Sequence, residues 1–119
     1  METIKHFKEL KVWQKGIEIV KDIYEITKHF PKEEMYGLTS QMRRSAISIP
    51  SNIAEGFKRY HTIEYKQFLY IALGSIAELE TQIVIAKEVG LLEDLMMDAM
   101  NEKLDHTSKM LSSLISKLR

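Results

Sequence analysis

The stretch FKRYHTIEYKQFLY, residues 57–70 of this 119-residue chain, interleaves cationic and aromatic side chains. Cationic groups attract phosphates, and aromatic rings can stack on unpaired bases, so the pattern indicates nucleic-acid binding. A second basic pair precedes it at residues 43–44. The same residues would also suit the solvated ends of helices. The candidate RNA- or DNA-binding residues are Arg43, Arg44, Lys58, Arg59 and Lys66.

Charge is distributed unevenly along the chain, although 17 basic and 17 acidic residues cancel overall. Residues 43–66 hold five basic and two acidic residues, whereas residues 75–105 hold eight acidic and two basic ones. Zero net charge argues against a generally basic nucleic-acid coat protein and does not exclude local patches. Self-association would repeat a weak patch and raise avidity without any new contact.

Residues typical of catalytic and metal sites occur without the spacing that such sites need. Glu25 and His29 are four residues apart, as are Glu102 and His106, whereas di-iron bundles use Glu-x-x-His. The chain has no cysteine, which excludes thiolate chemistry and disulfides, and no HExxH motif, phosphate-binding glycine loop or nucleophile elbow. We therefore expect no enzymatic activity, no cofactor and no metal site.

The segment RRSAISIPSNIAEGFKRY, residues 43–60, has an unusual polar face for a bundle helix. Pro50 should kink or loosen the helix at a cost of up to about 3 kcal/mol, and Ser48 and Ser51 could satisfy the freed backbone groups. One interpretation is structural: this face bonds to a neighbouring helix or subunit, and Arg44 pairs with Glu55 or Glu78. The other is functional: the face binds a partner such as phosphate, with Arg44 and Arg59 as donors.

Helical spacing of apolar residues dominates the chain, with only five glycines and two prolines to interrupt it. We expect helices over residues 8–30, 38–57, 62–89 and 92–118. Pro31 should stop the first helix, Thr62 should cap the third, and Gly90 should follow its end. Short connections predict a single-domain, up-down-up-down four-helix bundle.

The apolar stripe of each expected helix predicts the core. The first stripe contains Leu10, Trp13, Ile17, Val20 and Tyr24, and the second contains Leu38, Met42, Ala46, Ile49, Ile53 and Phe57. The third contains Tyr65, Phe68, Leu69, Ala72, Ile76, Leu79, Ile83 and Ala86. The fourth contains Leu92, Met96, Ala99, Leu104, Leu111, Leu114 and Leu118.

The third expected helix has a second row of apolar and small residues opposite its core stripe. This second seam also includes Val89. A small monomeric bundle has no use for it, and exposed apolar surface costs roughly 25 cal/mol per Å². The seam therefore predicts a subunit interface, although scattered exposed apolar residues are also normal on protein surfaces. The predicted interface residues are Ile71, Gly74, Ser75, Glu78, Gln82 and Ile85.

The composition is that of a globular protein, with 45% apolar and 29% charged residues. No segment approaches 18 uncharged apolar residues, and charges interrupt the N-terminal sequence, so we expect neither a membrane span nor a signal peptide. We therefore expect a cytoplasmic protein.

Three blocks together resemble one known family: FKELKVWQKGIEIVKDIYEIT, YGLTSQMRRSAISIPSNIAEGFKR and EYKQFLYIALGSIAELETQI. The chain is similar, over about residues 5–115, to the four-helix bundle proteins encoded in intervening sequences of bacterial large-subunit ribosomal RNA genes. The resemblance implies up-down bundles that assemble into ring-like homopentamers. A relative, the accessory variability protein of retroelements, binds nucleic acid through a basic surface, but this chain is neutral.

These observations lead to two functional hypotheses. The first is an oligomeric accessory scaffold that binds RNA or DNA through its basic surfaces. The second is a protein-interaction scaffold with no role in nucleic-acid binding. They differ in salt response, because phosphate binding weakens steeply as salt rises.

Overall fold

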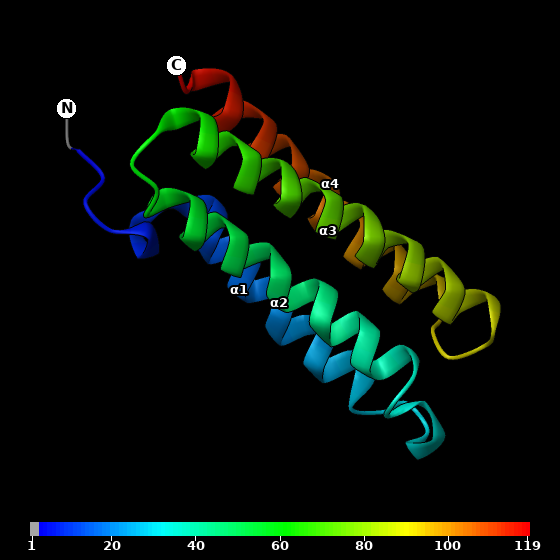
Figure 1. The fold of residues 1–119 in the computed structure, drawn as a ribbon. Helices are drawn as coiled ribbons and strands as arrows, with labels where there is room; N and C mark the ends of the chain where they lie inside the picture. Colours follow the sequence, from blue (N-terminus) through cyan, green and yellow to red (C-terminus); the bar gives the residue numbers. More distant parts are fainter. Residues whose placement is uncertain (1–2) are drawn as a thin grey trace.

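The computed structural model describes residues 3–119, and within them the chain is all-α (Figure 1). Its helices are α1 (Lys11–Thr27), α2 (Leu38–Phe57), α3 (Thr62–Glu88) and α4 (Asp94–Lys117). Two short 3-10 helices, η1 (Phe7–Glu9) and η2 (Lys32–Glu34), precede α1 and α2. The expected class, an all-α four-helix bundle, is confirmed.

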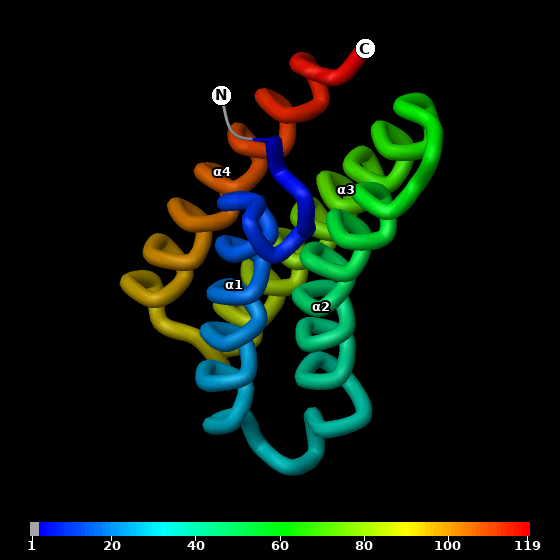
Figure 2. The backbone as a smooth tube through the Cα atoms, turned by 90° about the vertical axis from the view of Figure 1, so that its left-hand side faces the viewer, coloured from blue at the N-terminus to red at the C-terminus, as the bar shows by residue number. Residues whose placement is uncertain are grey.

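The four helices form an elongated bundle of 46 × 25 × 20 Å. The most extensive contact is between α2 and α3, while α1 packs on α2 and α4 packs on α3. The segment that leads into α1, the C-terminus and the α2–α3 turn lie at one end of the bundle, and the α1–α2 and α3–α4 turns lie at the other (Figures 1 and 2). Residues far apart in sequence therefore share each end.

The bounds of α2 agree with those expected, and α3 ends one residue early. Gly90 follows α3 with a φ of 83°, and Leu91 N–H donates to Ala86 C=O at 2.8 Å. This is a Schellman ending, which needs a residue in the left-handed region. The prediction that Thr62 caps α3 is wrong, because His61 occupies the cap position and makes no capping bond through its side chain.

Both outer helices are shorter than expected. Leu10 is extended, with a ψ of 124°, so it separates η1 from α1. At the other end, Phe30 N–H donates to Thr27 C=O in a tight turn, because a residue before proline avoids the helical region. The fourth helix begins at Asp94 because Gly90 turns the chain away from the α3 axis first.

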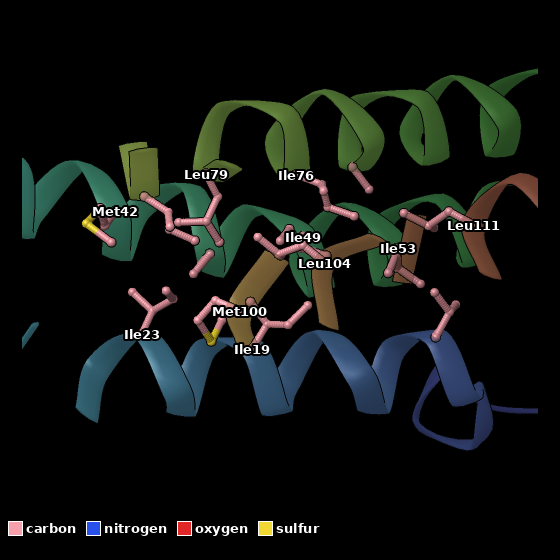
Figure 3. Close-up of a cluster of buried hydrophobic side chains, with 14 of the residues drawn as sticks. Ile19, Ile23, Met42, Ile49, Ile53, Ile76, Leu79, Met100, Leu104 and Leu111 are labelled. Atoms are coloured by element: carbon pink, nitrogen blue, oxygen red, sulfur yellow. The ribbon is translucent and has the colours of Figure 1, made fainter. Parts of the chain in front are cut away.

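The core lies along the axis of the bundle and contains mostly Ile and Leu (Figure 3). The predicted stripes of the second and third helices are largely confirmed, with residues at both ends only half-buried. Residues with at most 1% exposure include Met42, Ala46, Ile49, Ile53, Leu69, Ala72, Ile76, Leu79, Ile83 and Ala86.

The predicted core stripe of α1 is wrong by one position. Its buried residues are Val12, Gly16, Ile19, Ile23 and Thr27. The predicted residues lie beside them: most are half-buried, and Tyr24 is exposed. The chain has two adjacent apolar stripes here, and the deeper one contains a glycine and a threonine that periodicity alone discounts.

The predicted stripe of α4 is correct only in part. Leu104 and Leu111 are buried, but Met96 and Ala99 are exposed. Met100, Thr107 and Ile115 occupy the remaining buried positions. Thr107 is fully buried because its hydroxyl donates to Lys103 C=O at 2.8 Å, which satisfies its polar group within the helix.

Gly16 on α1 allows α1 to approach α2 closely. A Cβ on Gly16 would lie 3.1 Å from Pro50 Cβ, so α1 meets α2 at the proline. Helix α2 continues through Pro50 as a single element, so the expected kink or loosening does not end the helix. Ser48 does not serve as the expected substitute partner of the freed backbone, because its hydroxyl bonds to Ser75 on α3 at 2.8 Å.

Helix α3 is long and apolar enough to cross a membrane, judged by length and composition alone, with a mean hydropathy of 1.5 over its most apolar window. The sequence was expected to hold no such segment. One side of α3 forms the bundle core, and a core helix meets the same criteria. The other side gives the helix its second apolar face.

Candidate nucleic-acid interface and self-association face

Arg43 is half-buried, and its side chain contacts α1. Its Nε–H donates to Thr27 Oγ1 at 2.8 Å, and its guanidinium carbon lies 4.4 Å from the centroid of the Tyr24 ring. The side chain therefore joins α2 to α1 through a hydrogen bond and a cation–π contact. Of the five predicted nucleic-acid-binding residues, Arg43 has the clearest structural role.

Arg44 is the next residue on α2 and is exposed. It lines a groove between α2 and α3 together with Glu78 and Gln82. The predicted pairing of Arg44 with Glu55 or Glu78 does not occur among the described residues, because Glu55 pairs with Arg59. Arg43 and Arg44 also line one hollow of about 460 Å³ near the start of α2, although Tyr24 and Thr27 engage the Arg43 side chain.

The other three predicted nucleic-acid-binding residues, Lys58, Arg59 and Lys66, lie where α2 ends and α3 begins. Lys58 and Arg59 are exposed and line a hollow of about 510 Å³ with Phe7 and Ser51. Arg59 lies 3.8 Å from Glu55 Oε2 and 4.7 Å above the centroid of the Phe68 ring. Lys66, one turn into α3, is half-buried.

Two exposed rings occupy the turn beside these cations. Tyr60 is 98% exposed, and its ring stacks on that of His61 with centroids 5.8 Å apart and planes at 26°. Proteins that bind single-stranded nucleic acids combine exposed aromatic rings with neighbouring cations in this way. The structure thus keeps the interleaved pattern of the sequence on the surface.

The bundle separates charge between its two halves. We define the basic half as residues 3–17, 49–74 and 106–119, and the acidic half as residues 18–48 and 75–105. The Ser48–Ser75 bond and the Lys103–Glu18 pair mark the boundary. The basic half holds ten Lys or Arg and three Asp or Glu, and the acidic half holds seven and thirteen.

Most cations of the basic half were missed by sequence reasoning, because they lie far from residues 43–66. Seven of the ten make no ion pair with a described residue. They come from the start of the chain, the α2–α3 region and the end of α4, which share one end of the bundle (Figure 1). The seven are Lys5, Lys8, Lys11, Lys58, Lys66, Lys117 and Arg119, of which only Lys58 and Lys66 were predicted.

The outer face of α3 remains apolar and exposed along the helix. Ile71 is 50% exposed, and no atom lies within 4 Å of where a Cβ of Gly74 would be. We define the outer face by its exposed apolar and small residues between residues 63 and 89, with the predicted Glu78 beside them. These residues are Ile63, Tyr70, Ile71, Gly74, Ala77, Val84, Ile85 and Val89.

Two of the predicted interface residues are buried within the chain. Ser75 is 6% exposed and donates its single hydroxyl proton to Ile71 C=O at 3.1 Å. Its oxygen also bonds to that of Ser48 at 2.8 Å, and Asn52 Nδ2 donates to Ser48 Oγ within α2 at 2.9 Å. The structural interpretation is therefore confirmed for Ser48 alone, because Asn52 bonds within its own helix and Glu55 pairs with Arg59.

Gln82 is the other buried member, with 6% exposure. Its Oε1 is enclosed and has no hydrogen-bond partner among the described residues. A buried amide oxygen without a donor costs about 1–3 kcal/mol, so such a group needs an explanation. It lies at the groove that Arg44 and Glu78 also line.

Three groups have raised pKa values, and for Lys87 the main cause is its hydrogen bond to Glu88. Burial raises the pKa of the Tyr65 hydroxyl, whose ring packs edge-on against Phe57 beside Gly56. The pKa of Lys103 is raised mainly by its hydrogen bond to Asp22 Oδ2, at 2.6 Å. Within residues 3–119, no three His, Asp or Glu side chains gather closely enough to hold a metal ion.

Comparison with known proteins identifies relatives. The model of a family described as 23S rRNA-intervening sequence protein matches residues 8–113. A crystal structure from Bacteroides thetaiotaomicron VPI-5482, of a protein with unknown function from the S23 ribosomal protein family, superposes with a TM-score of 0.83. The two chains are 23% identical, and the alignment covers 89% of this chain and 96% of that one, which supports the fold. No curated protein matches the chain.

Proposed function

We propose that this chain, which belongs to the 23S rRNA-intervening sequence protein family, is a non-enzymatic scaffold that self-associates and binds RNA or DNA. The proposed binding surface is the basic half, and the proposed self-association surface is the outer face of α3. The observation that carries the nucleic-acid role is the separation of charge between the two halves of the bundle.

The basic half suits a phosphate backbone because its cations are numerous and mostly free. The basic half contains ten basic residues and three acidic ones, and seven of the ten make no ion pair with a described residue. The acidic half would repel phosphates, so a strand would approach from one end only. Lys58 and Arg59 lie at that end beside Tyr60, where a base could stack.

Self-association is supported by the exposed apolar face of α3. Contiguous exposed apolar surface of this kind marks interaction sites in soluble proteins. Gly74 leaves open space in the middle of the face, where a second backbone could approach. The element order and contacts also support the up-down-up-down topology that the sequence predicts.

A homopentameric ring is the assembly we propose. Copies in a cyclic ring are related by rotation about one axis. If the bundles stand along that axis, all basic halves lie on the same side of the ring. A strand crossing that side would meet several copies and gain avidity, which compensates for weak single contacts.

The test is fluorescence anisotropy with labelled single-stranded and duplex RNA and DNA, at about 50 and 200 mM salt, where phosphate contacts lose affinity. The test variant is Lys58→Glu/Arg59→Glu, and the matched control is Lys28→Glu/Lys32→Glu at the opposite end. We expect binding that weakens with salt, is lost in the test variant and persists in the control. Light scattering should give about 70 kDa, five times the 13.9 kDa chain.

Absence of binding at low salt would overturn the nucleic-acid role. Equal loss in both variants would mean that total charge matters and not the basic half. The protein-interaction scaffold would then be the better proposal, and the outer face of α3 its first candidate surface.

A further inference from the structure

The groove between α2 and α3 contains polar groups that the chain itself leaves without partners. It has a volume of about 380 Å³, and only polar side chains line it. Arg44 and Glu78 make no ion pair with a described residue, and Gln82 Oε1 accepts no hydrogen bond. The lining residues are Gln41, Arg44, Ser45, Ser48, Glu78 and Gln82.

This groove borders the outer face of α3. Gly74, Glu78 and Gln82 are spaced four residues apart, so they follow one side of the helix. Gly74 is exposed with open space beside it, whereas Gln82 is 6% exposed at the edge of the core. Anything that packs on the outer face near Gly74 would therefore also cover the mouth of the groove.

Covering the groove would take two opposite charges out of water. A buried charge is costly unless a hydrogen-bonded partner of opposite sign meets it. A partner with cations alone would leave Arg44 unpaired, and one with anions alone would leave Glu78 unpaired. A second copy of this chain brings both signs on the same surface, so it complements the groove.

We propose that Arg44 of one copy pairs with Glu78 of a second copy, and that this pair closes the groove over Gln82. The proposal rests on the self-association proposed above and assigns its polar contact. A guanidinium has five N–H donors, more than one carboxylate needs. The same Arg44 can therefore also donate to the Gln82 amide oxygen once that amide turns toward the groove.

Charge reversal tests the pair directly. Arg44→Glu and Glu78→Arg should each shift assembly to at least tenfold higher protein concentration, as measured by light scattering or sedimentation. Mixing the two single variants should restore assembly in large part, because copies of opposite kind then carry opposite charges at positions 44 and 78. A five-membered ring would keep at least one mismatched interface, so this recovery should be incomplete. The double variant R44E/E78R should assemble like the original chain, since every contact is complementary again.

The matched control is Arg59→Glu, which reverses another exposed arginine near the end of α2. It should leave assembly unchanged, and circular dichroism should show that all variants stay helical. This control separates a local pair from the effect of total charge.

The outcomes distinguish this inference from the proposal beneath it. A monomeric original chain would overturn the self-association and the pair together. An assembled original chain whose single variants also assemble would overturn the pair alone. Recovery in the double variant with no recovery at all on mixing would mean that Arg44 and Glu78 pair within one chain, which also overturns the proposal.

Discussion

Gly56 on α2 lies directly against Phe68 on α3, where the two helices leave their shared turn. A Cβ on Gly56 would come within 2.8 Å of Phe68 Cβ and 3.1 Å of the Tyr65 carbonyl oxygen. One of these neighbours is backbone, so it cannot rotate away. The absence of a side chain at residue 56 is what lets α2 and α3 converge at this end.

Replacing Gly56 with alanine should therefore destabilise the chain. Overpacking costs about 1–3 kcal/mol, which should exceed the propensity that alanine gains near the end of a helix. We expect the free energy of unfolding in urea to fall by about 1–2 kcal/mol. An unchanged or higher value would mean that α2 and α3 can separate here without loss.

Gly74→Ala should act in the opposite direction on the single chain. No atom lies within 4 Å of the new Cβ, so alanine gains up to about 1 kcal/mol of helix propensity. Urea unfolding at dilute, dissociated concentration should show this gain. If copies approach closely at Gly74, the same change should weaken assembly in sedimentation. Assembly that does not weaken would exclude a close contact at this residue.

Tyr60→Ala should reduce affinity for single-stranded RNA if a base stacks on this ring. Stacking contributes about 1–3 kcal/mol per base, so we expect roughly a tenfold loss or more. Tyr36→Ala is the matched control, because Tyr36 is 97% exposed but lies in the α1–α2 connection of the acidic half. Anisotropy titrations compare the two variants, and equal losses would argue against a site at the α2–α3 turn.

The Lys103–Asp22 pair should make stability fall at high pH. The hydrogen bond to Asp22 raises the pKa of Lys103 in the folded chain. The stabilisation is therefore complete below the unfolded pKa of about 10.4 and is lost as pH rises through the higher folded value. The pair is about one third exposed, so we expect less than about 1 kcal/mol.

Thermal unfolding between about pH 9 and 12 measures this effect around the titration of Lys103. The Asp22→Asn variant should lower the melting temperature near neutral pH and flatten part of the alkaline decline. A variant with the same alkaline slope as the original chain would assign that decline to other lysines and tyrosines.

The inner helices were more predictable than the outer ones. Long apolar stripes and turn residues bounded α2 and α3, and Gly90 marked the end of α3 correctly. In α1 and α4 the deepest positions include Gly16 and Thr107, which carry little hydrophobic signal. Gly16 is buried by the proximity of Pro50, and Thr107 by a bond to its own helix, and neither cause is local periodicity.

The candidate site was only partly accessible from the sequence. The cluster of Lys58, Arg59 and Tyr60 is local, so a short stretch of sequence revealed it. The other free cations of the basic half come from both ends of the chain, and only the folded arrangement brings them together. Arg43 was a reasonable candidate by type, but Thr27 and Tyr24 engage its side chain.

The division of the bundle into basic and acidic halves gives the chain a large electric dipole moment along its long axis. With equal numbers of basic and acidic residues, a uniform field would exert almost no net force on it near neutral pH. The same field would exert a torque. The molecule should therefore align without migrating, and parallel copies in a ring would add their dipoles, so dielectric relaxation would report their relative orientation.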